Sequence, residues 1–164
     1  MEEILCSGIG AVAPVVALER PGDKLPPLGA ARLSPERADW KALVDMLIAA
    51  AHFVVLVVAE TKGLQWEVER LVTNAPAVKI LMVLPTRARP HETWEAFRKR
   101  PNPASRLPGF AEGLPPDALA IAFKQDWSPV VFLGSPSPRA YKQIAQWVSS
   151  RAGEDGHPLE ADGV

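Results

Sequence analysis

The chain of 164 residues is poor in the residues that form covalent or metal-centred frameworks. It contains one cysteine, Cys6, which excludes an internal disulfide framework and a cysteine-rich zinc site. Its three histidines, His52, His91 and His157, are isolated and lack the spacing of metal ligands. We therefore expect no metal site. Stability must come from a hydrophobic core, which a chain of this length is able to bury.

Long apolar runs and an excess of charge are missing as well. No apolar stretch reaches the roughly 18 residues that span a bilayer, and the start Met1-Glu2-Glu3 is acidic where a signal peptide is basic. The formal net charge is −1, so no overall field attracts nucleic acid or anionic lipid. We expect a cytoplasmic protein with no nucleic-acid partner. The abrupt start also fits a soluble part of a longer, membrane-tethered protein.

Short motifs of common enzyme classes are absent too. The segment Gly8-Ile9-Gly10 lacks the third glycine of a dinucleotide-binding loop, and it precedes the first expected strand. The sequence contains no nucleophile elbow, no HExxH and no CxxC. Its serines and histidines are too scattered to indicate a catalytic triad. A catalytic role would therefore have to rest on a site without such a motif.

The sequence does contain a regular alternation of apolar runs and amphipathic segments. Continuous apolar runs predict buried strands at 12–18, 53–59 and 78–84, and helical spacing predicts helices at 35–51 and 63–74. Strands joined by helices call for parallel pairing with right-handed crossovers. We therefore expect a three-layer α/β fold with a mostly parallel central sheet of about five strands.

The remaining segments have weaker patterns. They predict a short helix at 2–9, a helix at 91–100, strands at 119–123 and 130–133, and a last helix at 137–150. Many of the 17 prolines lie in connections, and Glu19 to Arg32 is predicted to be a long loop. Residues 1–153 are expected to form one domain. The acidic segment 154–164 is expected to be a disordered tail.

The candidate functional spot is the turn from the strand ending near Ala59 into the helix that carries Trp66 and Glu67. Ligands of open α/β sheets bind beyond the carboxyl ends of the strands, and the loop 60–63 leaves such an end. Helical spacing places Glu67 within about the first turn, beside the apolar stripe, where partial burial would make a carboxylate useful. Acids are also favoured in the first turn of any helix, which is an ordinary structural explanation.

Trp66 projects away from the apolar stripe of its helix, which is unusual for so large an apolar side chain. It either packs under the proline-rich loop or offers a stacking surface for a ring or a partner. The other tryptophans are expected in or beside the core rather than on a nucleic-acid stacking platform: Trp40, Trp94, Trp127 and Trp147.

The segment from Val15 to Leu84 resembles the front half of a TIR (Toll/interleukin-1 receptor-like) domain. More loosely, it is similar to the nucleoside deoxyribosyltransferase group, which shares this flavodoxin-like architecture. Thr61 and Glu67 keep the family's spacing, in which a serine or similar residue is followed six positions later by a glutamate. The tryptophan departs from the family pattern, because it adjoins Glu67 instead of preceding it by four residues. The resemblance implies a flavodoxin-like fold and a signalling role, with bacterial defence or stress as its setting.

In enzymatic members of that family the glutamate contacts the ribose of NAD and supports loss of nicotinamide through an oxocarbenium-like transition state. The resemblance therefore implies Glu67 as the catalytic residue of an NAD or nucleotide glycohydrolase that requires no cofactor. The substrate-binding residues expected for such a site are Thr61, Lys62, Gly63, Trp66, Arg20, Lys24 and Arg32.

The proline-rich segment 21–32, taken with Gly-Leu-x-Trp-Glu at 63–67, is also similar to an uncharacterised bacterial family often carried beside membrane segments. That similarity implies a cytoplasmic domain tethered through a segment outside this chain. Two hypotheses stay open. The first is a TIR-like module that associates with itself or with another TIR-like domain, which the few polar residues and the displaced tryptophan of the site favour. The second is a nucleotide glycohydrolase.

Overall fold

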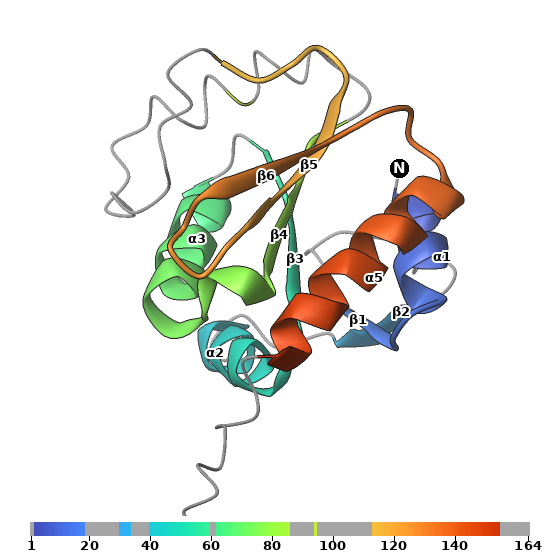
Figure 1. Cartoon of the computed structure of the whole chain (residues 1–164). Helices are drawn as coiled ribbons and strands as arrows, with labels where there is room; N and C mark the ends of the chain where they lie inside the picture. The colour runs from blue at the N-terminus through green and yellow to red at the C-terminus, as the bar shows by residue number, and fades with distance from the viewer. Residues whose placement is uncertain are drawn as a thin grey trace, which may run out of the picture.

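The computed structural model describes residues 2–18, 30–33, 40–59, 62–85, 94 and 113–154. In this part the chain is a mixed α/β structure in which helices cover both faces of a four-stranded sheet (Figure 1). The strands of this sheet, in spatial order, are β3 (Val54–Val57), β4 (Ile80–Val83), β5 (Ala118–Phe123) and β6 (Pro129–Leu133). A second, two-stranded sheet consists of β1 (Val15–Leu18) and β2 (Ala30–Leu33). The helices are α1 (Glu2–Gly10), α2 (Trp40–Ala50), α3 (Lys62–Asn74), the 3-10 turn η1 (Ala77–Lys79) and α5 (Pro138–Glu154).

The larger sheet is mixed, so the expectation of a mostly parallel sheet of about five strands is wrong. Strands β3 and β4 are parallel, whereas β4 pairs antiparallel with β5 and β5 antiparallel with β6. The connection between β5 and β6 explains part of this difference. It is the five-residue segment 124–128, and a link this short closes a hairpin but cannot make the crossover that parallel strands need.

Strand β2 corrects a second expectation, because residues 30–32 were assigned to a long loop. They pair in parallel with β1, from Val15 opposite Ala30 to Leu18 opposite Leu33. The sequence Ala-Ala-Arg-Leu has weak strand propensity of its own, so its conformation depends on a partner distant in the chain. The expected helix at 91–100 and the helix start at 35–39 lie outside the described residues, apart from Trp94.

The core consists of two apolar clusters, one on each face of the sheet. On one face α2 and α3 pack against the side chains of Leu56, Ile80, Met82 and Phe123. On the opposite face α1 and α5 pack against those of Leu81, Val83, Ala120 and Ala122. Alternation along β4 accounts for this division, since successive side chains of a strand point to opposite faces. The continuous apolar run at 78–84 is therefore buried on both sides, as its pattern predicts.

Strand β5 contains a bulge near its start. Ala118 lies opposite Leu133 while Ala120 lies opposite Phe132, so Leu119 is an extra residue in the ladder. As a result Leu119 and Ala120 both belong to the cluster under α5, whereas Ala118 belongs to the cluster under α3.

Helices α1 and α5 cross in close contact at Gly8. A Cβ atom added at Gly8 would lie 2.6 Å from the carbonyl oxygen of Pro138 and 2.8 Å from Cβ of Tyr141. Only glycine allows the two backbones to approach this closely.

Among the described residues, no helix has the length and apolar character needed to cross a membrane.

Candidate functional site

The predicted site lies at the start of α3, beyond the carboxyl ends of the two parallel strands. The backbone N–H of Val58 donates to the carbonyl of Val83 at 2.9 Å, which extends the β3–β4 pairing by one residue. The chain then reaches α3 at Lys62. The first turns of α3 therefore occupy the edge of the sheet at which ligands bind in open α/β folds.

Glu67 occupies the second turn of α3, on the border of its buried stripe. Leu64, Val68 and Leu71 are buried, Glu67 is half-buried and Glu69 is exposed, which is the order that helical spacing predicts. The first turn of α3 contains no acidic residue. Because the helix begins at Lys62, Glu67 lies beyond the first turn, in which the sequence pattern placed it. Stabilisation by the helix dipole fades there.

Trp66 is half-buried and contacts α2. Its ring lies 4.8 Å from the ring of Trp40, at an interplanar angle of 62°. The ammonium of Lys41 lies 5.2 Å from the centroid of the Trp66 ring, and the guanidinium carbon of Arg70 lies 5.8 Å from it. The indole thus forms part of the contact between α2 and α3, in an edge-to-face arrangement that aromatic rings favour.

An ion pair next to Trp66 joins the same two helices. Arg70 donates from Nε to Oδ1 of Asp45 at 2.8 Å and from Nη2 to Oδ2 at 2.6 Å. The hydrogen bond from Arg70 lowers the pKa of Asp45 below its ordinary value, and the bond to Asp45 raises the pKa of Arg70. Both side chains are more than a third exposed, at 38% and 36%. The pair therefore orients the helices more than it stabilises them.

The other predicted site residues are only partly placed. Lys62 and Gly63 form the start of α3, and Gly63 lies one turn before Glu67, while Arg32 lies in β2; for these three the backbone alone is described. Arg20, Lys24 and Thr61 lie outside the described residues. The structure therefore brings Gly63, Trp66 and Glu67 together on two turns of one helix.

Two surface hollows are lined by described residues, and neither includes Trp66 or Glu67. One has a volume of about 330 Å³ and the other about 210 Å³, and Trp147 of α5 lines both. They lie on the α5 side of the sheet, whereas α3 covers the opposite face. Sequence reasoning assigned Trp147 to the core or its border. The residue is indeed half-buried, but its place beside two hollows was not predicted.

Metal ligation has no candidate in the described part of the chain, where no three His, Cys, Asp or Glu side chains gather in a suitable cluster. No protein-family model matches the sequence, and neither the comparison with curated proteins nor that with solved structures found a match.

Proposed function

We propose that this chain is a TIR-like interaction module of flavodoxin-like type, which acts in signalling by associating with a second copy of itself. The parallel pair β3–β4 with α3 between its strands, and helices on both faces of the sheet, support this type of fold. The antiparallel strands β5 and β6 would be a departure from it.

The observation that carries the self-association is the uncharged outer face of α2. Val44 and Ile48 point into the core, while the opposite side of the helix exposes Met46, at 57%, together with three alanines. These alanines are Ala42, Ala49 and Ala50. A helix that is apolar on both sides is normally covered on both sides. An exposed outer face of this composition therefore favours a contact with another surface.

A second copy is the partner that this face fits. In a two-fold dimer the same patch meets itself, so any charge on it would face a like charge. The exposed sector of α2 from Ala42 to Ala50 carries no charge, and Lys41 and Asp45 lie on the side nearer α3. The small alanine side chains also let two helix backbones come close, which increases the dispersion contact.

The strand pair β1–β2 exposes apolar side chains too. Val16 is 49% exposed and Leu33 is 37% exposed. Their register, with Val16 opposite Ala31 and Leu18 opposite Leu33, places them on one face of this small sheet. We expect this face to add a second contact in the assembly.

Light scattering over a wide range of protein concentration tests the module. The mass of the wild-type protein should rise from monomer to dimer, and Met46→Glu should abolish the rise by placing two carboxylates across the two-fold contact. Leu133→Glu is the matched control, because Leu133 is 54% exposed and lies on β6. A wild-type protein that stays monomeric at every concentration would overturn the proposal, and so would equal behaviour of the two variants.

A glycohydrolase is the second candidate, and the half-buried carboxylate of Glu67 beyond the first turn of α3 favours it. In this proposal NAD or a related nucleotide lies over the carboxyl ends of β3 and β4. Glu67 stabilises the positive charge that develops on the ribose as nicotinamide leaves. Thr61 bonds the sugar, and the phosphates meet Arg20, Lys24 and Arg32.

Nicotinamide release from NAD tests this second candidate directly. Glu67→Gln should remove the activity, whereas Glu69→Gln, which changes the exposed glutamate two residues away, should keep it. Negligible release by the wild-type protein, also at concentrations at which it self-associates, would exclude the enzymatic function.

A further inference from the structure

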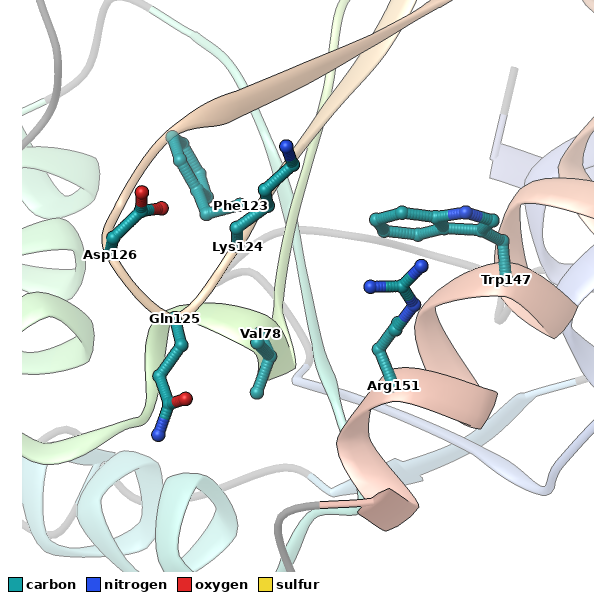
Figure 2. A pocket seen from close by; sticks show the side chains of 7 residues that line it. All are labelled: Val78, Phe123, Lys124, Gln125, Asp126, Trp147 and Arg151. Carbon is teal, nitrogen blue, oxygen red and sulfur yellow. The ribbon is translucent and has the colours of Figure 1, made fainter.

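The larger hollow lies between the hairpin of β5 and β6 and the last turns of α5 (Figure 2). It has a volume of about 330 Å³ and combines apolar and charged walls. Its lining residues are Val78, Phe123, Lys124, Gln125, Asp126, Trp147 and Arg151. Since η1 precedes β4, and β5 runs antiparallel to β4, the hollow lies at the amino end of β4. This is the edge opposite the start of α3.

The inner wall of the hollow is apolar and fixed. Val78 is 7% exposed and is anchored in the core. Phe123 also lines the hollow, but its side chain is buried in the cluster under α3. Trp147 is held by Phe132, whose ring lies 5.4 Å away at an interplanar angle of 76°. Side chains that are already immobilised lose little entropy when a ligand covers them. This wall is therefore suited to a flat apolar group.

Two cations border this apolar wall from opposite sides. The guanidinium carbon of Arg151 lies 5.1 Å from the centroid of the Trp147 ring, which orients the fork of its donors. Lys124 extends from the hairpin, and Figure 2 shows both side chains beside the gap between hairpin and helix. Among the described residues, neither cation forms an ion pair. Arg151 is thus available to an anion. The charge of Lys124 also acts on Asp126, whose pKa is lowered mainly by hydrogen bonds from Ser128 and further by this charge.

The one carboxylate in the lining is already engaged within the hairpin. Oδ1 of Asp126 accepts the backbone N–H of Ser128 at 2.9 Å, and hydrogen bonds from Ser128 lower the pKa of Asp126. The turn is closed further by the N–H of Lys124, which donates to the carbonyl of Ser128 at 2.9 Å. Asp126 therefore serves the turn, although it also interacts with the charge of Lys124.

We propose that this hollow binds a small organic anion in which a carboxylate or phosphate group is attached to a flat apolar ring. The anionic group would accept from the guanidinium of Arg151, whose paired donors match two acceptor oxygens, and Lys124 would approach it from the hairpin. The ring would lie on Val78 and Trp147. A pocket of about 300 Å³ is at the small end of ligand sites, which limits the ligand to a single ring. This site goes beyond the proposed association through α2.

Titration calorimetry of the whole chain with four probes tests the proposal: benzoate, phenyl phosphate, inorganic phosphate and benzyl alcohol. Benzoate or phenyl phosphate should bind with a Kd of about 1 mM or lower, and the stronger of the two identifies the anionic group. Inorganic phosphate lacks the ring and benzyl alcohol lacks the charge, so each should bind at least about tenfold more weakly. Equal binding of all probes, or no binding of the two ring anions, would overturn the site.

Variants of the two cations test whether these side chains bind the anion. Arg151→Gln and Lys124→Gln should each weaken binding of the ring anion by about tenfold, because a hydrogen bond to a charged group is lost. Arg139→Gln is the matched control on α5, since Arg139 is exposed and does not line the hollow. Circular dichroism checks that each variant is folded. Affinities unchanged by Arg151→Gln, or reduced equally by Arg139→Gln, would contradict the assignment.

Discussion

The two helical layers hold the sheet by different means. Helices α1 and α5 meet at Gly8 with no space for even one added carbon, and their contact lies within a buried cluster. Helices α2 and α3 meet through large, half-exposed side chains, in the ring contact of Trp40 with Trp66 and the ion pair of Asp45 with Arg70. The contact between α1 and α5 depends on close backbone packing, which leaves no space for an added side chain. The second depends on side chains that are able to move.

Gly8→Ala should have the largest effect, because it adds a Cβ atom 2.6 Å from a backbone oxygen that cannot turn aside. Overpacking of this kind costs about 3 kcal/mol, and the better helix propensity of alanine offsets only part of it. Urea unfolding measures the loss. Gly153→Ala in α5 is the control, since its nearest neighbour would be His52 at 4.0 Å; it should be neutral or slightly stabilising. An equal effect of both changes would show that the crossing of α1 and α5 is not tight.

Trp66→Ala should be the next largest change, with a loss of about 2 kcal/mol, roughly half the cost of truncating a fully buried aromatic residue. A double-mutant cycle with Trp40→Ala isolates the ring contact, whose coupling should be about 1 kcal/mol. Urea unfolding of the two single variants and the double variant supplies the values. Strict additivity would mean that the rings are neighbours without a stabilising contact, and the contrast between the layers would weaken.

Tyr141 tests the packing of α1 and α5 through a smaller expected effect. Its hydroxyl is buried and has no hydrogen-bond partner among the residues that the structure describes, and burial raises its pKa. The folded state holds this proton more firmly than the unfolded state. Ionisation of Tyr141 therefore leaves the free energy of unfolding unchanged below pH about 10 and lowers it as the pH rises further. Tyr141 is the only tyrosine in the chain, so tyrosinate absorbance reports it alone. Ionisation should be delayed until the protein unfolds. Tyr141→Phe should stabilise by about 1 kcal/mol, since it removes an unsatisfied group.

Asp45→Asn should give the smallest effect, because the ion pair with Arg70 is exposed to solvent. Arg70 lowers the pKa of Asp45, so the pair contributes above the ordinary pKa of about 4 and its contribution disappears as the pH falls through the lowered value. The stability difference between wild type and variant should therefore shrink in acid. A difference independent of pH, measured by thermal unfolding across the acid range, would point to a packing effect of Asp45.

The sequence predicted the individual elements better than their pairing. The apolar run at 53–59 and the stripe of Leu64, Val68 and Leu71 indicated β3 and α3, because burial imposes their periods locally. Parallel pairing throughout was inferred from the alternation of elements over residues 12–84, and it failed for β5. The spacing between the two late strands already contained the correction, since a link of about six residues permits a hairpin alone.

The hollow beside α5 could not be predicted in the same way, because it is assembled from three separate segments: η1, the β5–β6 hairpin and α5. One part of it was visible in the sequence. Trp147 and Arg151 are four residues apart, a spacing that brings side chains together on a helix. The predicted turn before α3 illustrates the opposite limit. Helical spacing placed Glu67 beside the core, but it gave no indication that Trp66 lies against Trp40 of α2.

The bulge at Leu119 shifts the alternation of side chains between the two faces within β5. Upstream of it Ala118 faces α3, and downstream the even-numbered residues Ala120 and Ala122 face α5. A deletion of this one residue would straighten the ladder. It would leave Ile121 and Phe123 on the side of α3, because the deleted residue is the unpaired one. If all six residues of β5 paired regularly instead, strict alternation from Ala118 would turn Phe123 toward α5. The bulge therefore decides which side of the molecule receives the bulky half of the strand.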